Sequence, residues 1–207
     1  MSEILAELFS SKVRAAVLGH MLPRPHLGYS LTDLSRVLGL PISSLQHECY
    51  KLERIGVLRA KRDGNARRYR VNTACPVRKE LTALVVAAIG QDAALRATLQ
   101  GIAGLESAFI ARFLPIDPSD GDGAGVAPIP LVLIGEVALE EIDAAQERVA
   151  NILGLPTGKI EAVFYRPGDW RARLEQRSPY AIWLVSGPRT DLLGQPVPDL
   201  AVASAPE

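Results

Sequence analysis

Cysteines and aromatic residues are scarce in this chain. Cys49 and Cys75 are its only cysteines in 207 residues, too few for a disulfide framework, and their spacing is not that of a paired Cys-x-x-Cys metal site. Aromatic residues make up 5% of the chain, while hydrophobic residues reach 48%, which excludes the composition of a disordered protein. These values predict a folded protein from a reducing compartment.

Long hydrophobic runs and a secretory signal are also missing. No stretch reaches the roughly 18 uninterrupted apolar residues of a membrane span. The N-terminus, Met1-Ser2-Glu3, lacks the basic, then apolar, then small-residue order of a signal peptide. We therefore expect a cytoplasmic protein with no membrane partner.

The chain has no net charge, but its halves differ. Residues 1–90 hold 14 Lys and Arg against 7 Asp and Glu, whereas residues 91–207 hold 9 against 16. A basic half followed by an acidic half indicates that the first meets a polyanion, which repels the second. The length allows two domains. We predict one domain over residues 1–89, a second over 90–195, and a disordered tail over 196–207.

Three helices are predicted in the first domain. Apolar residues at helical spacing indicate one helix from Ile4 to Met21. A short second helix follows, with Ser30 or Thr32 as its N-cap. Its inward-facing residues are expected to be Leu31, Leu34, Val37 and Leu38. The third helix spans residues 42–55, and its apolar stripe is Ile42, Leu45, Cys49, Leu52 and Ile55.

The third helix has small and polar residues near its N-terminus. Such residues can approach the base edges of DNA without a steric clash, and Gln or Ser can hydrogen-bond to them. The candidate base or phosphate contacts are Ser43, Ser44, Gln46, His47 and Lys51.

A basic β-hairpin is predicted after this helix. The alternating segments Val57–Asp63 and Ala66–Val71 are joined by Gly64-Asn65, a typical two-residue turn. The basic residues of the hairpin are Arg59, Lys61, Arg62, Arg67, Arg68 and Arg70. This density indicates contact with phosphates or the minor groove. The candidate contacts are Lys61, Arg62, Asn65, Arg67 and Arg68.

The order of these elements resembles the winged helix-turn-helix regulators of the ArsR and MarR type. The resemblance covers residues 8–75 and is carried by Leu34–Ser43, Leu52–Leu58 and Arg62–Tyr69. It implies that the helix at 42–55 docks in the major groove and that the hairpin at 59–70 is the wing, on the DNA backbone or in the minor groove. It also implies a homodimer on a pseudo-palindromic site, in which the helix at 76–89 could pair with its twin.

The second half alternates between strands and helices, which predicts a small α/β domain and an α+β chain as a whole. Strands are predicted at 106–113, 129–134, 160–165 and 190–193, and helices at 91–100, 139–153, 168–176 and 180–185. The arrangement resembles the minimal nucleotidyltransferase domain found fused to ArsR-like winged helices. The residues that carry this resemblance are Ala108-Phe109-Ile110, Ile129–Gly135 and Leu192-Leu193-Gly194.

The catalytic motif of that superfamily is lost here. Active members carry Gly-Ser after the first strand and Asp-x-Asp at the start of the second, because two carboxylates hold magnesium. This chain has Ala111-Arg112-Phe113 and Pro128-Ile129-Pro130 instead, so we predict no catalytic residue, no metal and no cofactor. A displaced Asp-x-Asp at Asp120 and Asp122 leaves a magnesium and nucleotide site as an alternative.

The remaining candidates favour packing over chemistry. Cys49 falls on an apolar stripe, and His20 with His26 gives no complete metal site. Trp170 and Trp183 are expected to be core anchors.

The sequence predicts a homodimeric, sequence-specific transcriptional regulator that binds double-stranded DNA. The second domain is assigned to dimerisation or to binding an unknown small-molecule or protein effector. The alternatives are a nucleotidyltransferase targeted by its winged helix and a protein-interaction adaptor.

Overall fold

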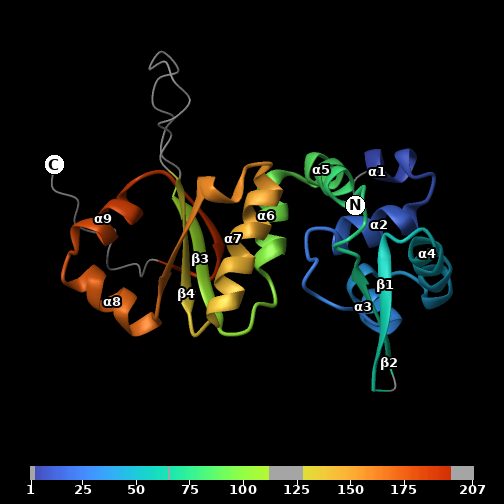
Figure 1. Ribbon diagram of the computed structural model, residues 1–207, viewed down its shortest axis with the longest axis horizontal. Coiled ribbons are helices and arrows are strands. Elements are labelled where there is room, and N and C mark those ends of the chain that lie inside the picture. Colours follow the sequence, from blue (N-terminus) through green and yellow to red (C-terminus); the bar gives the residue numbers. More distant parts are fainter. Residues whose placement is uncertain (1–2, 65, 112–127, 197–207) are drawn as a thin grey trace, which may run out of the picture. The chain divides into compact units, whose positions relative to one another are not determined.

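The computed structural model describes residues 3–64, 66–111 and 128–196, and it confirms the mixed α+β class (Figure 1). The chain divides into two compact units, the first ending at Thr98 and the second beginning at Leu99. Residues 90–98, assigned above to the second domain, therefore group with the first unit. From residue 197 onward, the predicted tail lies outside the described residues.

The first unit contains helices and one two-stranded sheet. Its helices are α1 (Glu3–Leu8), α2 (Lys12–Met21), α3 (Leu31–Leu38), α4 (Ile42–Arg54), α5 (Arg78–Ile89) and most of α6 (Gln91–Leu99). Its strands are β1 (Leu58–Asp63) and β2 (Ala66–Val71).

The predicted single helix from Ile4 to Met21 is wrong, because it is broken between α1 and α2. Ser10 adopts a positive φ of 50°, which a right-handed helix cannot accommodate. Ser11 then caps α2, and its hydroxyl oxygen accepts a hydrogen bond from the Arg14 amide at 3.1 Å. The apolar spacing continues across the break because both helices pack on the same core.

The turn between α3 and α4 is set by local signals. Ser30 is the N-cap of α3, and it forms a capping box with Asp33. Gly39 ends the helix with a left-handed φ of 65°, a conformation that glycine adopts without a steric penalty. Val37, predicted to face inward, is exposed instead, and Leu34 is buried.

The middle of the predicted α4 stripe is buried and its two ends are not. Leu45, Cys49 and Leu52 are at most 2% exposed, so the packing role predicted for Cys49 is confirmed. Ile42 and Ile55 are 47% and 64% exposed, contrary to the prediction. The burial predicted for these two residues is wrong because they lie at the first position and at the C-cap of α4, while the core is filled by the residues between them.

The second unit is built on a four-stranded mixed sheet with the order β5-β4-β3-β6. The strands are β3 (Leu105–Ala111), β4 (Ile129–Gly135), β5 (Ile160–Tyr165) and β6 (Arg189–Leu193). Only the β4–β5 pair is parallel among the described strands of this sheet. The helices that follow β4 are α7 (Leu139–Leu153), the short 3₁₀ turn η1 (Thr157–Lys159), α8 (Pro167–Glu175) and α9 (Pro179–Ser186).

Helices cover the sheet of the second unit. Phe109, Val132 and Ile134 pack against residues of α8 and α9 on one face. Neighbouring residues of β4 alternate to the opposite face, where α7 lies (Figure 1). Trp170 is 3% exposed, as predicted for a core anchor, whereas Trp183 is 48% exposed, so its predicted core role is wrong. Trp183 instead stacks on Tyr180, with ring centroids 5.5 Å apart.

Candidate nucleic-acid interface

The hairpin of the first unit places like charges directly opposite each other. Its antiparallel register pairs Arg59 with Arg70, Lys61 with Arg68, and Arg62 with Arg67. Directly opposed residues lie on the same face of a sheet, and like charges at such positions destabilise it. Where no carboxylate of the protein compensates these charges, an anion would stabilise the hairpin.

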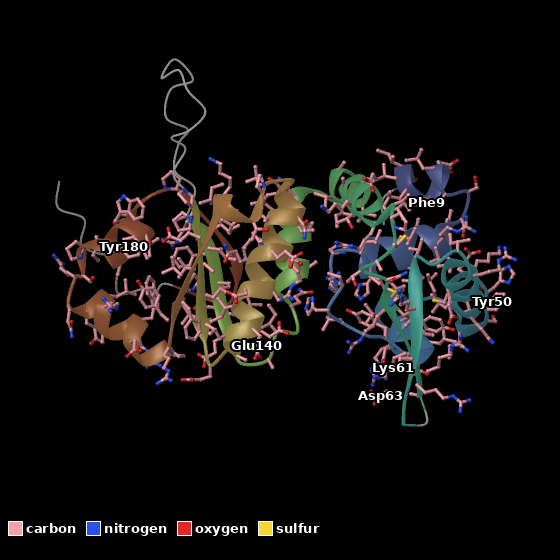
Figure 2. All side chains as sticks on the ribbon, viewed as in Figure 1. Phe9, Tyr50, Lys61, Asp63, Glu140 and Tyr180 are labelled. Atoms are coloured by element: carbon pink, nitrogen blue, oxygen red, sulfur yellow. The ribbon has the colours of Figure 1, made fainter. Side chains whose placement is uncertain are left out.

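The two faces of the hairpin differ in character. Tyr69 is buried in the core, and its backbone exchanges hydrogen bonds with Tyr29 at 2.8 and 2.9 Å. The side chains of Arg59, Lys61, Arg68 and Arg70 alternate to the other face. A hollow of about 610 Å³ beside the hairpin is lined by Arg59, Ala60, Lys61, Arg62, Asp63, Arg68, Arg70, Val71, Asn72 and Thr73. Lys61 lies along the hairpin toward its tip, where Asp63 precedes the turn (Figure 2).

Arg67 is held by α4. Its Nη2 donates hydrogen bonds to both carboxylate oxygens of Glu53, at 2.8 and 2.6 Å. Its guanidinium carbon lies 5.6 Å from the centre of the Tyr69 ring. The hydrogen bond with Glu53 raises the pKa of Arg67 above its ordinary value, so this side chain stays charged.

Arg68 is held by the region around α3. Its Nη1 donates to the Gly28 carbonyl at 3.2 Å and to Asp33 at 3.3 Å, and its Nε lies 3.2 Å from an oxygen of Asp63. The pKa of Asp33 is lowered first by hydrogen bonds from Ser30, and further by the nearby Arg68 and Arg36. Asp33 is therefore an anion that partly compensates the charge of Arg68.

The other basic residues of the hairpin have no such partner. In the described part of the chain, Arg59, Lys61, Arg62 and Arg70 form no ion pair with a carboxylate. All four are exposed. Four uncompensated positive charges thus lie on one hairpin, while Asn65 is outside the described residues.

The exposed face of α4 lies beside β2. A hollow of about 450 Å³ is lined by Leu31, Ser43, Gln46, His47, Tyr50, Arg67 and Tyr69. It brings together three of the predicted α4 contacts, Ser43, Gln46 and His47, with Arg67 of the hairpin. Tyr50 is 60% exposed and was missed, although an aromatic residue on the polar side of this helix was a usable signal.

No family model matches the chain. No curated protein and no solved structure matches it either. Among the described residues, no single helix is long and apolar enough to cross a membrane; α5 and α6 meet that test only together, and they are bent by 118° at their junction.

The remaining predicted α4 contacts, Ser44 and Lys51, do not line the hollow. Lys51 donates a hydrogen bond to Glu48 at 3.2 Å, and Glu48 also accepts one from Nε of Arg14 in α2 at 2.8 Å. The Glu48 side chain is only 9% exposed. Burial alone would raise its pKa, but the hydrogen bonds from Lys51 and Arg14 prevail and lower it. This group fixes α4 on α2, and the sequence pattern alone does not indicate it.

Cys49 and His20 are both held in their uncharged forms. Burial, with Glu48 and Glu53 nearby, raises the pKa of Cys49 to about 12, so the thiol stays protonated. Burial and Arg24 lower the pKa of His20 to about 4, and its ring packs edge-on against Tyr29 at 4.9 Å. Where the structure describes the chain, no three His, Cys, Asp or Glu residues gather as a metal site.

The end of β3 and the start of β4 lie side by side, as the pairing of Ile110 with Leu131 requires. Ala111 and Pro130 occupy these strand ends where the resemblance would place Gly-Ser and a carboxylate. Asp120 and Asp122 lie outside the described residues.

The second unit has a separate hollow of about 570 Å³. It is lined by Phe164, Tyr165, Arg166, Asp169, Ala172, Arg173, Gln176 and Ser178. The guanidinium carbon of Arg173 lies 5.6 Å from the centre of the Tyr165 ring. Aromatic and charged groups therefore meet in a space large enough for a small ligand.

Proposed function

We propose that the first unit is a winged helix-turn-helix domain and that the protein is a sequence-specific, DNA-binding transcriptional regulator. The observation that carries this proposal is the set of four exposed basic residues on opposed strands of the hairpin, Arg59, Lys61, Arg62 and Arg70, which form no ion pair in the described part of the chain. A hairpin that only supported the fold would gain stability from opposite charges at these positions. Glu53 and Asp33 already compensate Arg67 and Arg68. Phosphate groups would supply the negative charge for the other four residues, and phosphate contacts account for a large share of the affinity of proteins for duplex DNA.

In this proposal α3, the turn at Gly39 and α4 form the helix-turn-helix, and α4 enters the major groove. Its exposed Ser43, Gln46 and His47 face the base edges, where an amide or hydroxyl can both donate and accept hydrogen bonds. The hairpin is the wing and lies on the backbone or in the minor groove.

We infer that the regulator is a homodimer that uses an apolar surface on α1 and α5. These helices are in contact, and Ile4 and Leu8 on α1, with Val77 and Leu84 at α5, are exposed. A second copy would remove these side chains from water. Two copies also match the two halves of a pseudo-palindromic DNA site.

We assign the second unit to dimerisation, partner binding or ligand sensing. A small-molecule effector would fit the hollow beside Tyr165. A ligand bound there should change the fluorescence of Trp170, whose ring lies 5.0 Å from that of Tyr165. A compound that releases DNA without changing this fluorescence would argue against the assignment.

The test of the regulator proposal is selection of bound fragments from fragmented genomic DNA, including the region upstream of the protein's own gene, at several salt concentrations. We expect saturable binding to a discrete inverted repeat. Equal retention of all fragments at every salt concentration would reject sequence-specific binding. It would favour the nucleotidyltransferase or the adaptor instead.

A further inference from the structure

Two adjacent arginines on β2 connect the wing to two different helices. Arg67 is bound to Glu53 on α4, and Arg68 is bound to Asp33 on α3. The contacts hold one strand of the hairpin against both helices of the helix-turn-helix. Both arginines were predicted above to contact DNA, as was Arg62.

The Arg67 contact has the geometry of a structural pair. One guanidinium nitrogen reaches both oxygens of Glu53, and the Tyr69 ring supports the same guanidinium. Tyr69 is itself buried, and so provides a fixed base for the pair. Ion pairs between exposed side chains are usually weak, but well-formed geometry and fixed neighbours make them contribute.

It would be unfavourable for Arg67 to exchange its partner Glu53 for a DNA phosphate. If Arg67 left Glu53, the carboxylate, which is 26% exposed, would remain without this partner beside a negatively charged duplex. The same argument applies to Asp33, which is 30% exposed. Each exchange replaces one anion by another and adds repulsion between the released carboxylate and the DNA.

We propose that Arg67 and Arg68 are positioning residues, and that they fix the wing relative to α4 and to α3, respectively. The phosphate contacts then fall to Arg59, Lys61, Arg62 and Arg70. This inference rests on the proposed function. Because α4 and the wing must engage neighbouring parts of one DNA site, their relative angle controls affinity without adding a charge contact.

The test compares salt dependence of DNA binding in Arg67→Gln, with Arg62→Gln as the matched control on the opposing strand. For Arg62→Gln, the slope of log K against log salt should become less negative by about 0.9 per wing. For Arg67→Gln, binding should weaken about tenfold, a usual coupling for one charge pair, with an unchanged slope. The charge-swapped double variant Glu53→Arg with Arg67→Glu should regain affinity relative to Arg67→Glu alone.

A second measurement does not require DNA. The backbone ¹⁵N heteronuclear NOE of wing residues 66–70 should decrease in Arg67→Gln and stay at the wild-type value in Arg62→Gln. The inference is wrong, and Arg67 contacts phosphate, if two results are found together. The salt dependence of DNA binding becomes weaker in Arg67→Gln as it does in Arg62→Gln, and the charge-swapped double variant binds DNA no better than Arg67→Glu alone. An unchanged NOE would also reject it. Failure of the wild type to bind DNA would reject the proposed function, while the NOE would still report on the pair.

Discussion

The salt dependence of DNA binding can be worked out from the wing. Four of its basic residues, Arg59, Lys61, Arg62 and Arg70, are exposed and without a carboxylate partner in the described structure. Each phosphate contact contributes about −0.9 to the slope of log K against log salt. One wing should therefore give a slope of about −3.6, and the two wings of a dimer about −7. Contacts from Arg67 and Arg68 would make the dimer slope about −11.

These slopes correspond to large changes in affinity. Between about 50 and 200 mM salt, one wing should lose roughly 10²-fold and a dimer roughly 10⁴-fold in affinity. Fluorescence anisotropy with a labelled duplex of random sequence measures the slope, because the electrostatic part of binding does not depend on sequence. Arg171→Gln, at an exposed residue of α8 in the second unit, is a control that should leave the slope unchanged. A wild-type slope near zero would refute the reasoning.

Three further predictions follow from other contacts. Glu48→Gln should lower the free energy of unfolding at neutral pH by about 1.5–3 kcal/mol in denaturant titrations. Because the pKa of Glu48 is lowered in the fold, this difference should shrink as pH falls below 4.5. The pKa of His20 is about 4 in the folded protein, below its ordinary value of 6.5. The free energy of unfolding of the wild type should therefore decrease as the pH falls from 6.5 to 4, and His20→Gln should weaken this pH dependence. Leu84→Glu on α5 should give monomers by light scattering, whereas Leu139→Glu on α7 should not; dimers of Leu84→Glu would contradict the proposed interface.

Elements with strong local signals could be predicted from sequence. The amphipathic spacing of residues 139–153 and the apolar run at 160–165 gave the bounds that α7 and β5 have. The two-residue turn predicted between the strands also implies the hairpin register, in which Asp63 and Ala66 are partners. The opposed basic pairs follow from that register.

Features that depend on tertiary neighbours could not be predicted. The break at Ser10 leaves the apolar spacing intact, so nothing in the periodicity marks it. Ile42 and Ile55 keep the spacing of the apolar stripe and are exposed all the same, at the two ends of α4. Arg67 and Arg68 look like any other basic residue in a wing until the fold brings Glu53 and Asp33 beside them.

The most direct test of the central claim is the affinity ratio between the selected inverted repeat and a scrambled duplex, measured at one salt concentration. Specific regulators reach ratios of about 10³ or more, and loss of one base contact costs roughly 1–3 kcal/mol. We predict such a ratio for the wild type. Gln46→Ala should reduce it by relaxing preference at one base pair, with binding to the scrambled duplex unchanged. A wild-type ratio near one, or a ratio unaffected by all of Ser43→Ala, Gln46→Ala and His47→Ala, would contradict the account.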